Sequence, residues 1–495
     1  MSDQFDTPIA ERTADETLRQ RLSMRTKIIL DHTNSVAAQR DHRIEQNRFY
    51  YEDDWRYMRF LVPEGLRVLE LGCGTGQLLA RLKPAIGVGV DFSSEMIAIA
   101  RRNNPQHTFI VADVEDGNLV SKLVGPFDFI VISDTMGSFQ DCITTIENLL
   151  PLCTRDTRLI VAYYSHLWEP ILKVGEWLGA KTTEPELNWL SSHGIVSILE
   201  LSGFEVIKRE WRQLLPKKWF GLGTLVSRYI ATLPGIRRLA LRNYVVAQPS
   251  RERRLGTPSA SVVIPCRNEK GNIEPAIRRL PRFCDDLEIL FVEGNSDDGT
   301  FAEVLRVQAA YPDLNIKALQ QKGTGKGDAV HLGFEKARGD ILIILDADLT
   351  VAPEDLPKFY AAITSGKGDF INGTRFVYPM ETGAMRLLNN WSNRAFARIF
   401  SYLLNQRLTD TLCGTKVLSR TNYRKIIANR DYFGDFDPFG DFDLIFGAVK
   451  LHLKIVEIPV SYANRRYGTT QISRFSDGWL LLRMVLFAYR KLKAL

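Results

Sequence analysis

The sequence predicts an α/β protein of two domains, each built on a parallel sheet. Three observations lead to this fold class. Apolar stretches of strand length alternate with helical stretches in both halves of the chain. A glycine-rich turn directly follows the first strand, over residues 67–76, and in the second half Asp346 and Asp348 follow a strand. Because open α/β sheets bind ligands outside the carboxyl ends of their strands, we expect two separate sites.

Composition places the chain among ordinary globular proteins. Its 495 residues are 45% hydrophobic and 25% charged, with a net charge of +6. This length fits two cores, and the small positive charge suits phosphate-bearing ligands without indicating nucleic acid. The 6 cysteines include no CxxC pair, so neither zinc nor a thioredoxin-like motif is predicted.

The N-terminus and the length of the apolar stretches indicate the cellular location of the protein. The polar N-terminus lacks the apolar stretch of a secretory signal. No segment reaches the roughly 20 apolar residues of a membrane-spanning helix. We therefore expect a cytoplasmic protein, with a peripheral contact at the inner face of the membrane as an alternative.

A polar segment flanked by prolines is the expected linker between the domains. The predicted parts are a first domain with a helical N-terminal extension (1–250), the linker (251–258), a second domain (259–475) and a C-terminal amphipathic helix (476–495).

Two stretches each have two interpretations. In the last helix Trp479, Leu482, Leu486 and Tyr489 share one face, with basic residues behind them. This pattern fits an interfacial helix or a last helix docked on the core. The basic, aromatic stretch 217–249 fits a membrane contact, or a helical cover followed by a final strand near residues 243–248.

The elements of the first domain lead to a nucleotide-type site. After helices up to about residue 60, the expected strands are VLEL, GVGV, TFIVAD, FDFIVIS and RLIVAYY. Gly72, Gly74 and Gly76 let the backbone turn tightly and approach a ligand. Asp91 ends the second strand, where it can accept both hydroxyls of a ribose, and Asp113 ends the third, placed to accept from an adenine amino group.

The competing ligand for this site is a nicotinamide dinucleotide. Its fingerprint is GxGxxG rather than GxGxG, and no hydride-transfer set follows the late strands. Ser133, Asp134, Tyr163, Tyr164 and His166 line the expected mouth. His166 is either a general base for an alcohol or a surface histidine.

Residues 40–210 resemble the class I S-adenosylmethionine-dependent methyltransferases, through ELGCGTG and the two strand-end acids. The resemblance implies that S-adenosylmethionine is held by Glu70, Gly72, Gly74 and Gly76 at its methionine end, by Asp91 at the ribose and by Asp113 at the adenine. It names no methyl acceptor. The alternative is a domain that binds S-adenosylmethionine only as a sensor.

The second half repeats the strand-helix alternation, with SVVIPC, LEILFVE, NIKALQQ, DILIILD and DFINGT as strands. Polar residues gather at the strand ends: Asn268, Glu269, Glu293, Asp346 and Asp348. Carboxylates at i and i+2 on a strand point to one face, where hard oxygen ligands can hold a divalent cation. GTGKGD, at 323–328, lacks the Ser or Thr that a phosphate-binding P-loop requires.

Residues 259–475 resemble the family-two glycosyltransferases of the GT-A fold, in particular the dolichol-phosphate mannose synthases and polyprenyl-phosphate glycosyltransferases. The matching segments are IPCRNE, VEGNSDDGT, GKGDA, LDADLT, GTRF, DTLCGTK and RRYGTTQ. The resemblance implies an inverting enzyme that takes a nucleotide-diphosphate sugar, of the GDP-mannose or UDP-glucose type, with Mg²⁺ or Mn²⁺.

The resemblance also assigns roles to residues. Asp346 and Asp348 would hold the metal on the diphosphate. The implied nucleotide-sugar site consists of Pro265, Asn268, Glu269, Glu293, Lys326, Asp346, Arg375, Arg386 and Arg465. Thr470-Gln471 stands where relatives carry a serine-lysine pair, and VEGNS replaces the commoner VDDGS, so the donor is less well defined than the fold.

The acceptor decides the mechanism. A phosphate monoester, with a second pKa of about 6, is already a nucleophile at neutral pH, whereas an alcohol needs a general base. Asp441 is the candidate base, Asp410 the second choice, and Asp443 completes an acidic pair with Asp441; each could instead orient the acceptor or cap a helix. We expect transfer to a polyprenyl phosphate or lipid-linked glycan, with both domains in one pathway, and a polysaccharide glycosyltransferase acting on a sugar hydroxyl as the alternative.

Overall fold

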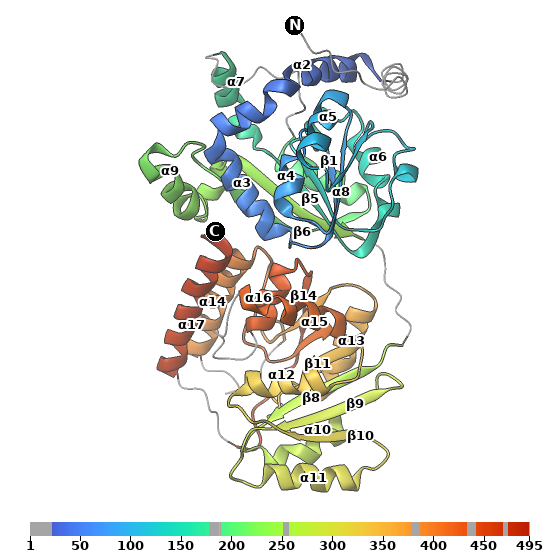
Figure 1. Ribbon diagram of the computed structural model, residues 1–495. Coiled ribbons are helices and arrows are strands. Elements are labelled where there is room, and N and C mark those ends of the chain that lie inside the picture. Colours follow the sequence, from blue (N-terminus) through green and yellow to red (C-terminus); the bar gives the residue numbers. More distant parts are fainter. Residues whose placement is uncertain are drawn as a thin grey trace. The chain divides into compact units, whose positions relative to one another are not determined.

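The computed structural model describes residues 22–177, 188, 190–250, 257–378, 387–432, 442–468 and 474–494 (Figure 1). The chain divides into two compact units, residues 1–251 with 494–495, and residues 252–493. Each unit contains one seven-stranded mixed sheet with helices packed on it. The predicted fold class, two α/β domains, is confirmed.

The sheet of the first unit has the order β3-β2-β1-β4-β5-β7-β6. Its strands are β1 (Arg67–Leu71), β2 (Ile86–Asp91), β3 (Thr108–Val111), β4 (Phe127–Ser133), β5 (Cys153–Tyr164), β6 (Phe204–Arg212) and β7 (Arg242–Pro249). Strands β1 to β5 are parallel, and β7 runs antiparallel to both β5 and β6. Val68, Leu69 and Leu71 are fully buried, as expected of a central parallel strand covered on both faces.

Helices cover both faces of this sheet. They are α2 (Met24–Gln46), α3 (Arg48–Leu61), α4 (Gln77–Leu82), α5 (Ser94–Asn103), α6 (Cys142–Glu147), α7 (Glu169–Trp177), α8 (Ser192–Leu201) and the short α9 (Leu222–Leu225). Helix α3 packs with α4 and α2 with α5, whereas α6 packs with α8 on the other side of the sheet (Figure 1). The strand expected near residues 243–248 is β7, and β6 before it was not anticipated.

The sheet of the second unit has the order β10-β9-β8-β11-β13-β12-β14. Its strands are β8 (Ala260–Cys266), β9 (Leu287–Glu293), β10 (Asn315–Gln320), β11 (Ile341–Ile344), β12 (Phe370–Thr374), β13 (Lys416–Ser419) and β14 (Ile455–Pro459). Strand β13 runs antiparallel to β11 and β12, and the other pairs are parallel. The sequence indicated β8 to β12 but neither β13 nor β14.

The helices of the second unit are α10 (Ile273–Arg279), α11 (Thr300–Ala310), α12 (Lys326–Lys336), α13 (Leu356–Thr364), α14 (Leu387–Leu404), α15 (Arg420–Ala428), α16 (Phe442–Lys450) and α17 (Arg474–Ala488). Helix α17 packs beside α14, and a π-helical turn, Tyr489–Lys493, follows it (Figure 1). No helix of the described residues is both long enough and apolar enough to cross a membrane.

Helix α17 combines the two interpretations of the C-terminal helix. Leu481, Met484 and Ala488 are buried against the unit. Trp479, Leu482 and Leu486 are exposed on another side of the helix. The basic residues beyond it serve packing: Lys491 donates to the Tyr432 carbonyl oxygen at 2.7 Å, and the buried Lys493 donates to Asn405 Oδ1 at 2.8 Å.

Candidate active sites

In the first unit the glycines after β1 form a turn that suits glycine alone. Gly72, Gly74 and Gly76 have φ angles of 73°, 51° and 74°, in the left-handed region. A Cβ at Gly72 would lie 2.0 Å from Thr135 Oγ1, whereas a Cβ at Gly74 would meet nothing within 4 Å. The backbone at Gly74 therefore has open space beside it, at the carboxyl edge of the sheet.

Two acids flank this turn. Asp91, the last residue of β2, accepts hydrogen bonds from the Gly74 N–H at 2.8 Å and the Ser93 N–H at 2.9 Å. Burial raises the pKa of Asp91, and these donors act against the rise. Glu70 on β1 is 3% exposed, and within the described parts of the chain its Oε2 has no hydrogen-bond partner. Burial raises the pKa of Glu70 to about 8.

Asp113 lies just beyond β3, at the same edge as Asp91. It accepts a hydrogen bond from the Glu115 N–H at 3.0 Å, and burial raises its pKa. The predicted cofactor residues thus lie along the carboxyl ends of three neighbouring strands. An orphaned carboxyl oxygen, an open glycine backbone and two further acids fit a ligand that offers several hydrogen-bond donors, such as S-adenosylmethionine.

Helix α2 runs over this edge. Thr75 Oγ1 donates to Asp41 Oδ1 at 2.7 Å, and Ser93 Oγ donates to Asn34 Oδ1 at 2.6 Å. At the first turn of the helix Arg25 donates to the Gly137 carbonyl oxygen at 3.4 Å. The helix is thus fixed to the loops after β1, β2 and β4. Sequence reasoning did not anticipate Asn34 or Asp41, because polar residues on a polar helix carry no local signal of a distant partner.

A buried arginine organises the expected methyl-acceptor end. Arg242, fully buried at the start of β7, donates to Asp54 Oδ1 at 3.0 Å and forms a second ion pair with Asp134. Burial opposes its charge, yet Asp134 and Asp54 hold the pKa of Arg242 above its ordinary value. Its guanidinium carbon lies 5.1 Å from the ring centre of Tyr164 and 5.9 Å from that of Tyr50.

The same cluster leaves one carboxylate accessible, because the side chain of Asp134 is 33% exposed. Of the other expected mouth residues, Tyr163 is buried in the core and His166 is exposed on the surface.

In the second unit the two predicted metal ligands lie in a turn after β11. The strand ends at Ile344, so the aspartates are not at i and i+2 of an extended strand as the sequence suggested. Asp346 Oδ1 forms an ion pair with Lys326 Nζ at 2.7 Å, from the first residue of α12. Burial favours the neutral carboxyl, but Lys326, Lys416 and Arg375 hold the pKa of Asp346 below its ordinary value.

A close backbone approach accompanies Asp346. A Cβ at Gly414 would lie 1.9 Å from Asp346 Oδ2. Only glycine therefore leaves room for this carboxylate in its observed position.

Arg465 joins the other half of the predicted site. It donates to Asp348 Oδ2 at 2.8 Å and to Glu269 Oε1 at 2.8 Å. Asp348 Oδ1 also accepts from the Thr350 N–H at 3.1 Å, which fixes the turn. Burial raises the pKa of Glu269, and Arg465 acts against the rise. Asp348, Glu269 and Arg465, far apart in sequence, are thus brought together.

The remaining nucleotide-site candidates lie at the ends of β8 and β9. Glu293, 1% exposed, accepts from the Ser296 N–H at 2.5 Å and from Gln320 Nε2 at 3.0 Å. Asn268 Oδ1 accepts from the Asp297 N–H at 3.0 Å. Both acceptors are engaged in shaping the loop that follows β9. Pro265 is half-buried on β8, where it pairs with Val292 of β9.

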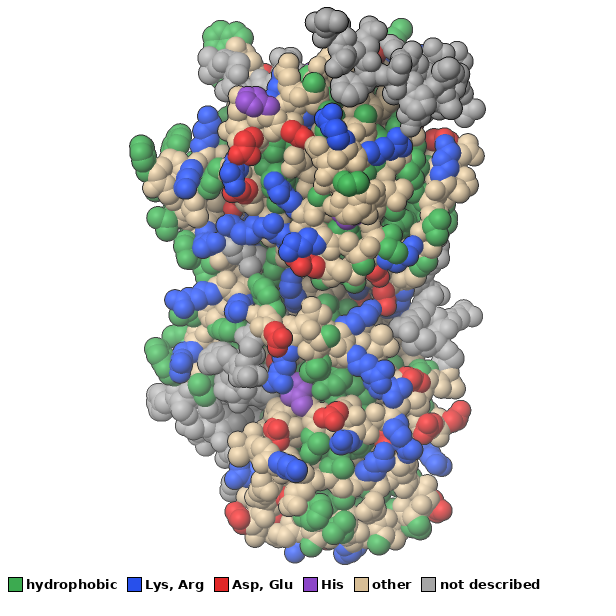
Figure 2. Space-filling view, viewed as in Figure 1, with side chains coloured by type: hydrophobic (Ala, Val, Ile, Leu, Met, Phe, Trp, Pro, Cys, Tyr) green, Lys and Arg blue, Asp and Glu red, His purple; other side chains and the backbone are tan. Residues whose placement is uncertain are grey.

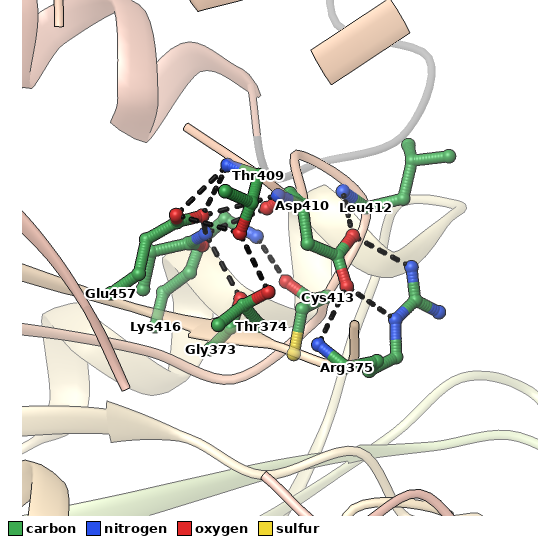
Figure 3. Close-up of polar contacts among 10 residues, drawn as sticks. Gly373, Thr374, Arg375, Thr409, Asp410, Leu412, Cys413, Lys416 and Glu457 are labelled. Carbon is green, nitrogen blue, oxygen red and sulfur yellow. Dashed lines mark hydrogen bonds and ion pairs between the residues drawn. The ribbon is translucent and has the colours of Figure 1, made fainter. Parts of the chain in front are cut away.

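Arg375 and Asp410 form a buried bidentate pair (Figure 3). Arg375 Nε lies 2.6 Å from Asp410 Oδ2, and Nη2 lies 2.8 Å from Oδ1. Asp410 Oδ1 also accepts from the Leu412 N–H at 3.1 Å. Burial would lower the pKa of Arg375, but Asp410 raises it above its ordinary value. Asp410, at 0% exposure, has its carboxylate turned to Arg375, which is the geometry of a positioning residue.

Glu457 of β14 supports this loop from the other side. It accepts from the Thr409 N–H at 2.8 Å and from the Asp410 N–H at 3.1 Å (Figure 3). Lys416, fully buried on β13, donates to the Cys413 carbonyl oxygen at 2.6 Å. Gly414 and Lys416 both belong to the DTLCGTK segment, so that segment was the available signal for two site residues that the sequence analysis did not single out.

The predicted acids near α16 are only partly described. Asp443 Oδ2 lies 2.6 Å from His331 Nε2, and the other nitrogen of His331 lies 3.1 Å from the Tyr423 hydroxyl. Asp441 and Arg386 lie outside the described residues, as does the Thr470-Gln471 pair.

The donor set can be compared with what a metal ion needs. Among the described residues no group of three or more His, Cys, Asp or Glu side chains gathers as metal sites do. Asp346 and Asp348 are each balanced by a cation, Lys326 and Arg465. Mg²⁺ commonly binds through one or two carboxylates and completes its shell with water and substrate phosphates. Two aspartates therefore fit an ion that arrives with a diphosphate.

Comparisons with known proteins agree with this division. Residues 42–209 match the model of a methyltransferase domain, and residues 261–427 match that of glycosyl transferase family 2. The low-salt glycan biosynthesis hexosyltransferase Agl6 of Haloferax volcanii is 28% identical over 233 residues, which is 46% of this chain and 53% of that protein.

Two further relatives are similar over shorter stretches. The dolichol-phosphate mannosyltransferase of Pyrococcus furiosus is 36% identical over 119 residues, which is 24% of this chain and 33% of that protein. The polyprenol monophosphomannose synthase of Mycolicibacterium smegmatis is 28% identical over 229 residues, which is 44% of this chain and 82% of that protein. The chain thus spans about half the length of the first relative and a third of the second. It contains an N-terminal methyltransferase domain and a C-terminal family 2 glycosyltransferase domain that resembles polyprenyl-phosphate mannosyltransferases.

Proposed function

We propose that the chain is a bifunctional enzyme of glycan assembly. Its second unit transfers a sugar, with inversion, from a nucleotide-diphosphate donor to a polyprenyl phosphate or lipid-linked glycan. Its first unit transfers a methyl group from S-adenosylmethionine to an acceptor of the same pathway. The observation that carries the glycosyl half is the pair Asp346 and Asp348, each held by a cation at one sheet edge. The names of relatives that act on dolichol phosphate and polyprenol favour the lipid acceptor.

Charge at this edge suits the departure of a nucleotide diphosphate. Mg²⁺ or Mn²⁺ held by Asp346 and Asp348 would offset the negative charge that develops on the leaving diphosphate. Arg465 and Lys326 neutralise the two carboxylates until donor arrives, and can then donate to phosphate oxygens. The planar fork of Arg465 suits such contacts. Glu269, paired with Arg465, would keep that arginine oriented toward the site.

The acceptor side needs positive charge more than a base. Asp410 holds Arg375 in one orientation, and a phosphate acceptor could be bound by such an arginine without losing a proton. For a hydroxyl acceptor Asp441 remains the candidate base. The exposed Trp479, Leu482 and Leu486 of α17 would support a peripheral contact with the inner face of a membrane.

Sugar transfer into a lipid phase tests the glycosyl half. Labelled GDP-mannose or UDP-glucose would be incubated with Mn²⁺ and polyprenyl phosphate, and the organic phase counted, for wild type, Asp348→Asn and the control Asp313→Asn. Asp313 is an exposed acid of the same unit. We expect lipid label with wild type and the control, and its loss with Asp348→Asn. Donor turnover without lipid label would contradict the lipid acceptor and move the proposal to a glycan hydroxyl.

Substitution of Asp91 tests the methyl half. Asp91→Asn should weaken S-adenosylmethionine binding, because one of its oxygens also fixes the Gly74 N–H of the turn. Loss of methyl transfer to the glycosylated product, with sugar transfer unchanged, is expected of two catalytic units. If the rate of sugar transfer instead changes when S-adenosylmethionine is added or removed, the result would favour the sensor.

A further inference from the structure

The segment between β6 and β7 is far longer than the connection requires. Arg212 and Arg242 are direct partners in the antiparallel pair. Such hairpins close through loops of two to five residues, yet residues 213–241 intervene and form α9 and a π-helical turn, Val226–Ile230. A helical insertion of this length therefore needs a reason other than joining the two strands.

This segment exposes large apolar side chains together. Phe220 is fully exposed and Trp219 is 60% exposed, at a turn where both have positive φ angles. Further exposed apolar residues of the segment are Leu222, Leu225, Tyr229 and Ile230. Apolar side chains gathered in this way, unlike single ones scattered over a surface, mark an interaction site.

Charge in the segment has one sign. From residue 211 to residue 250 the sequence contains no Asp or Glu, whereas the segment carries Lys217, Lys218, Arg228, Arg237 and Arg238. Figure 2 shows hydrophobic side chains interspersed with Lys and Arg over the region of α9. A partner must therefore present both an apolar interior and negative charge.

Helix α7 also exposes apolar side chains, and the residue before it contacts this segment. Trp168, just before it, donates from Nε1 to the Leu239 carbonyl oxygen at 2.8 Å, which ties α7 to the segment. Ile171 and Val174 are exposed on the helix, and Trp177 is 84% exposed. The surface formed by segment 213–241 and α7 is called the apolar-basic surface below.

The apolar-basic surface is anchored at the methyl-acceptor end of the first unit. Gln213 Nε2 donates to the Tyr50 carbonyl oxygen at 3.0 Å, and the Ser165 N–H donates to the Leu241 carbonyl oxygen at 2.8 Å. The Tyr50 ring lies beside the buried Arg242, which forms an ion pair with Asp134. Both ends of the segment therefore adjoin the acceptor end.

We propose that the apolar-basic surface docks the methyltransferase unit on a lipid bilayer with anionic headgroups. Aromatic and aliphatic side chains enter the headgroup boundary while Lys and Arg pair with anionic lipids, at about 1 kcal/mol per basic residue. Protein-protein interfaces, in contrast, are depleted in Lys. Docking of this kind is separate from glycosyl transfer. It would bring lipid-borne acceptors to the end of the unit that contains Asp134, so the methyl acceptor would be a membrane-bound molecule.

Vesicle flotation of the full chain tests this without any substrate. The vesicles would be pure phosphatidylcholine, or phosphatidylcholine with phosphatidylglycerol. The protein variants would be the aromatic variant Trp219→Ser/Phe220→Ser, the charge-reversal variant Lys217→Glu/Lys218→Glu and the control Val124→Ser. Val124 is 80% exposed and precedes β4, at the opposite edge of the same sheet. Thermal unfolding of each variant would verify that it folds.

We expect wild type and Val124→Ser to float with anionic vesicles. The aromatic variant should partition at least about tenfold less, and the charge-reversal variant should lose its preference for phosphatidylglycerol. Flotation unchanged in both variants would overturn the proposal, and so would a wild-type protein that does not float. A wild-type protein that forms dimers, which the aromatic variant abolishes, would also overturn it. Vesicle binding needs neither donor nor S-adenosylmethionine, so failure of either activity would leave this result interpretable.

Discussion

At the scale of single residues, Glu70 links the methyltransferase site to pH. In the folded unit burial raises its pKa from 4.5 to about 8. Between these values the folded state keeps the proton and the unfolded state releases it, so the free energy of unfolding falls as pH rises. The slope from one such group is up to about 1.4 kcal/mol per pH unit.

Glu70→Gln should remove this slope. Urea unfolding of the first unit at pH 5, 6, 7 and 8 should show that the free energy of unfolding of the variant rises relative to that of wild type as pH rises. Glu64→Gln, which changes an exposed acid paired with Lys83, serves as control and should follow wild type. A constant difference between Glu70→Gln and wild type at all four pH values would refute the raised pKa.

Asp410 gives a second prediction at this scale. Asp410→Asn leaves the buried Arg375 with an amide in place of its charged partner, and breaking a buried ion pair in this way costs about 3–5 kcal/mol. Chemical denaturation of the second unit should show a loss of this size, while Asp313→Asn should show less than about 0.5 kcal/mol. A small loss for Asp410→Asn would mean that Arg375 is not held by this pair.

Residue roles that depend on distant partners were the least predictable. The sequence analysis singled out Asp346 and Asp348 because two acids directly follow an apolar run. The link from Arg465 to Asp348 crosses more than a hundred positions, and Arg242 with Asp54 even more, so no local pattern reports either. A buried arginine in an apolar strand looks in sequence like an exposed one.

At the scale of elements, the apolar strands were predictable and the mixed ones were not. Strands β1 and β8 are mostly apolar, with Glu70 and Ser261 among the polar exceptions, and nearly all of their side chains are buried. Strand β6 buries Lys208 and Glu210, and β13 begins at the fully buried Lys416. A strand that buries charged residues lacks the apolar pattern from which strands are predicted. The cover helix α2 was expected only as a helix, since its contacts are tertiary.

The loop before β13 carries a prediction at this scale. Gly414→Ala places a Cβ where Asp346 Oδ2 now lies, so the carboxylate must rotate away while the backbone stays allowed. We expect a folded protein whose Mn²⁺-dependent binding of UDP or GDP is at least about tenfold weaker, because one of the two proposed metal ligands moves. Isothermal titration with Mn²⁺ and nucleotide would measure it. Gly117→Ala, whose Cβ meets nothing within 4 Å, should bind as wild type does.

At the scale of the whole molecule, two cores and two sites in one chain raise the question of coupling. The core of the first unit is centred on β1, β4 and β5, and that of the second on β8, β9 and β11, with no residue in common. Covalent joining keeps the product of one site at high local concentration near the other, which needs no contact between the units. A sensor, in contrast, requires that ligand binding in one unit change the other.

Calorimetry distinguishes these two cases. Separate cores predict two unfolding transitions, and a ligand that binds only one folded unit stabilises that unit by about 2.7 kcal/mol at a hundredfold excess over its Kd. S-adenosylhomocysteine should therefore raise one Tm, and UDP or GDP with Mn²⁺ the other. Asp91→Asn should abolish the first shift alone, and Asp348→Asn the second alone. If either ligand moved both transitions, the units would share a coupling free energy, and methyl-donor binding would regulate sugar transfer.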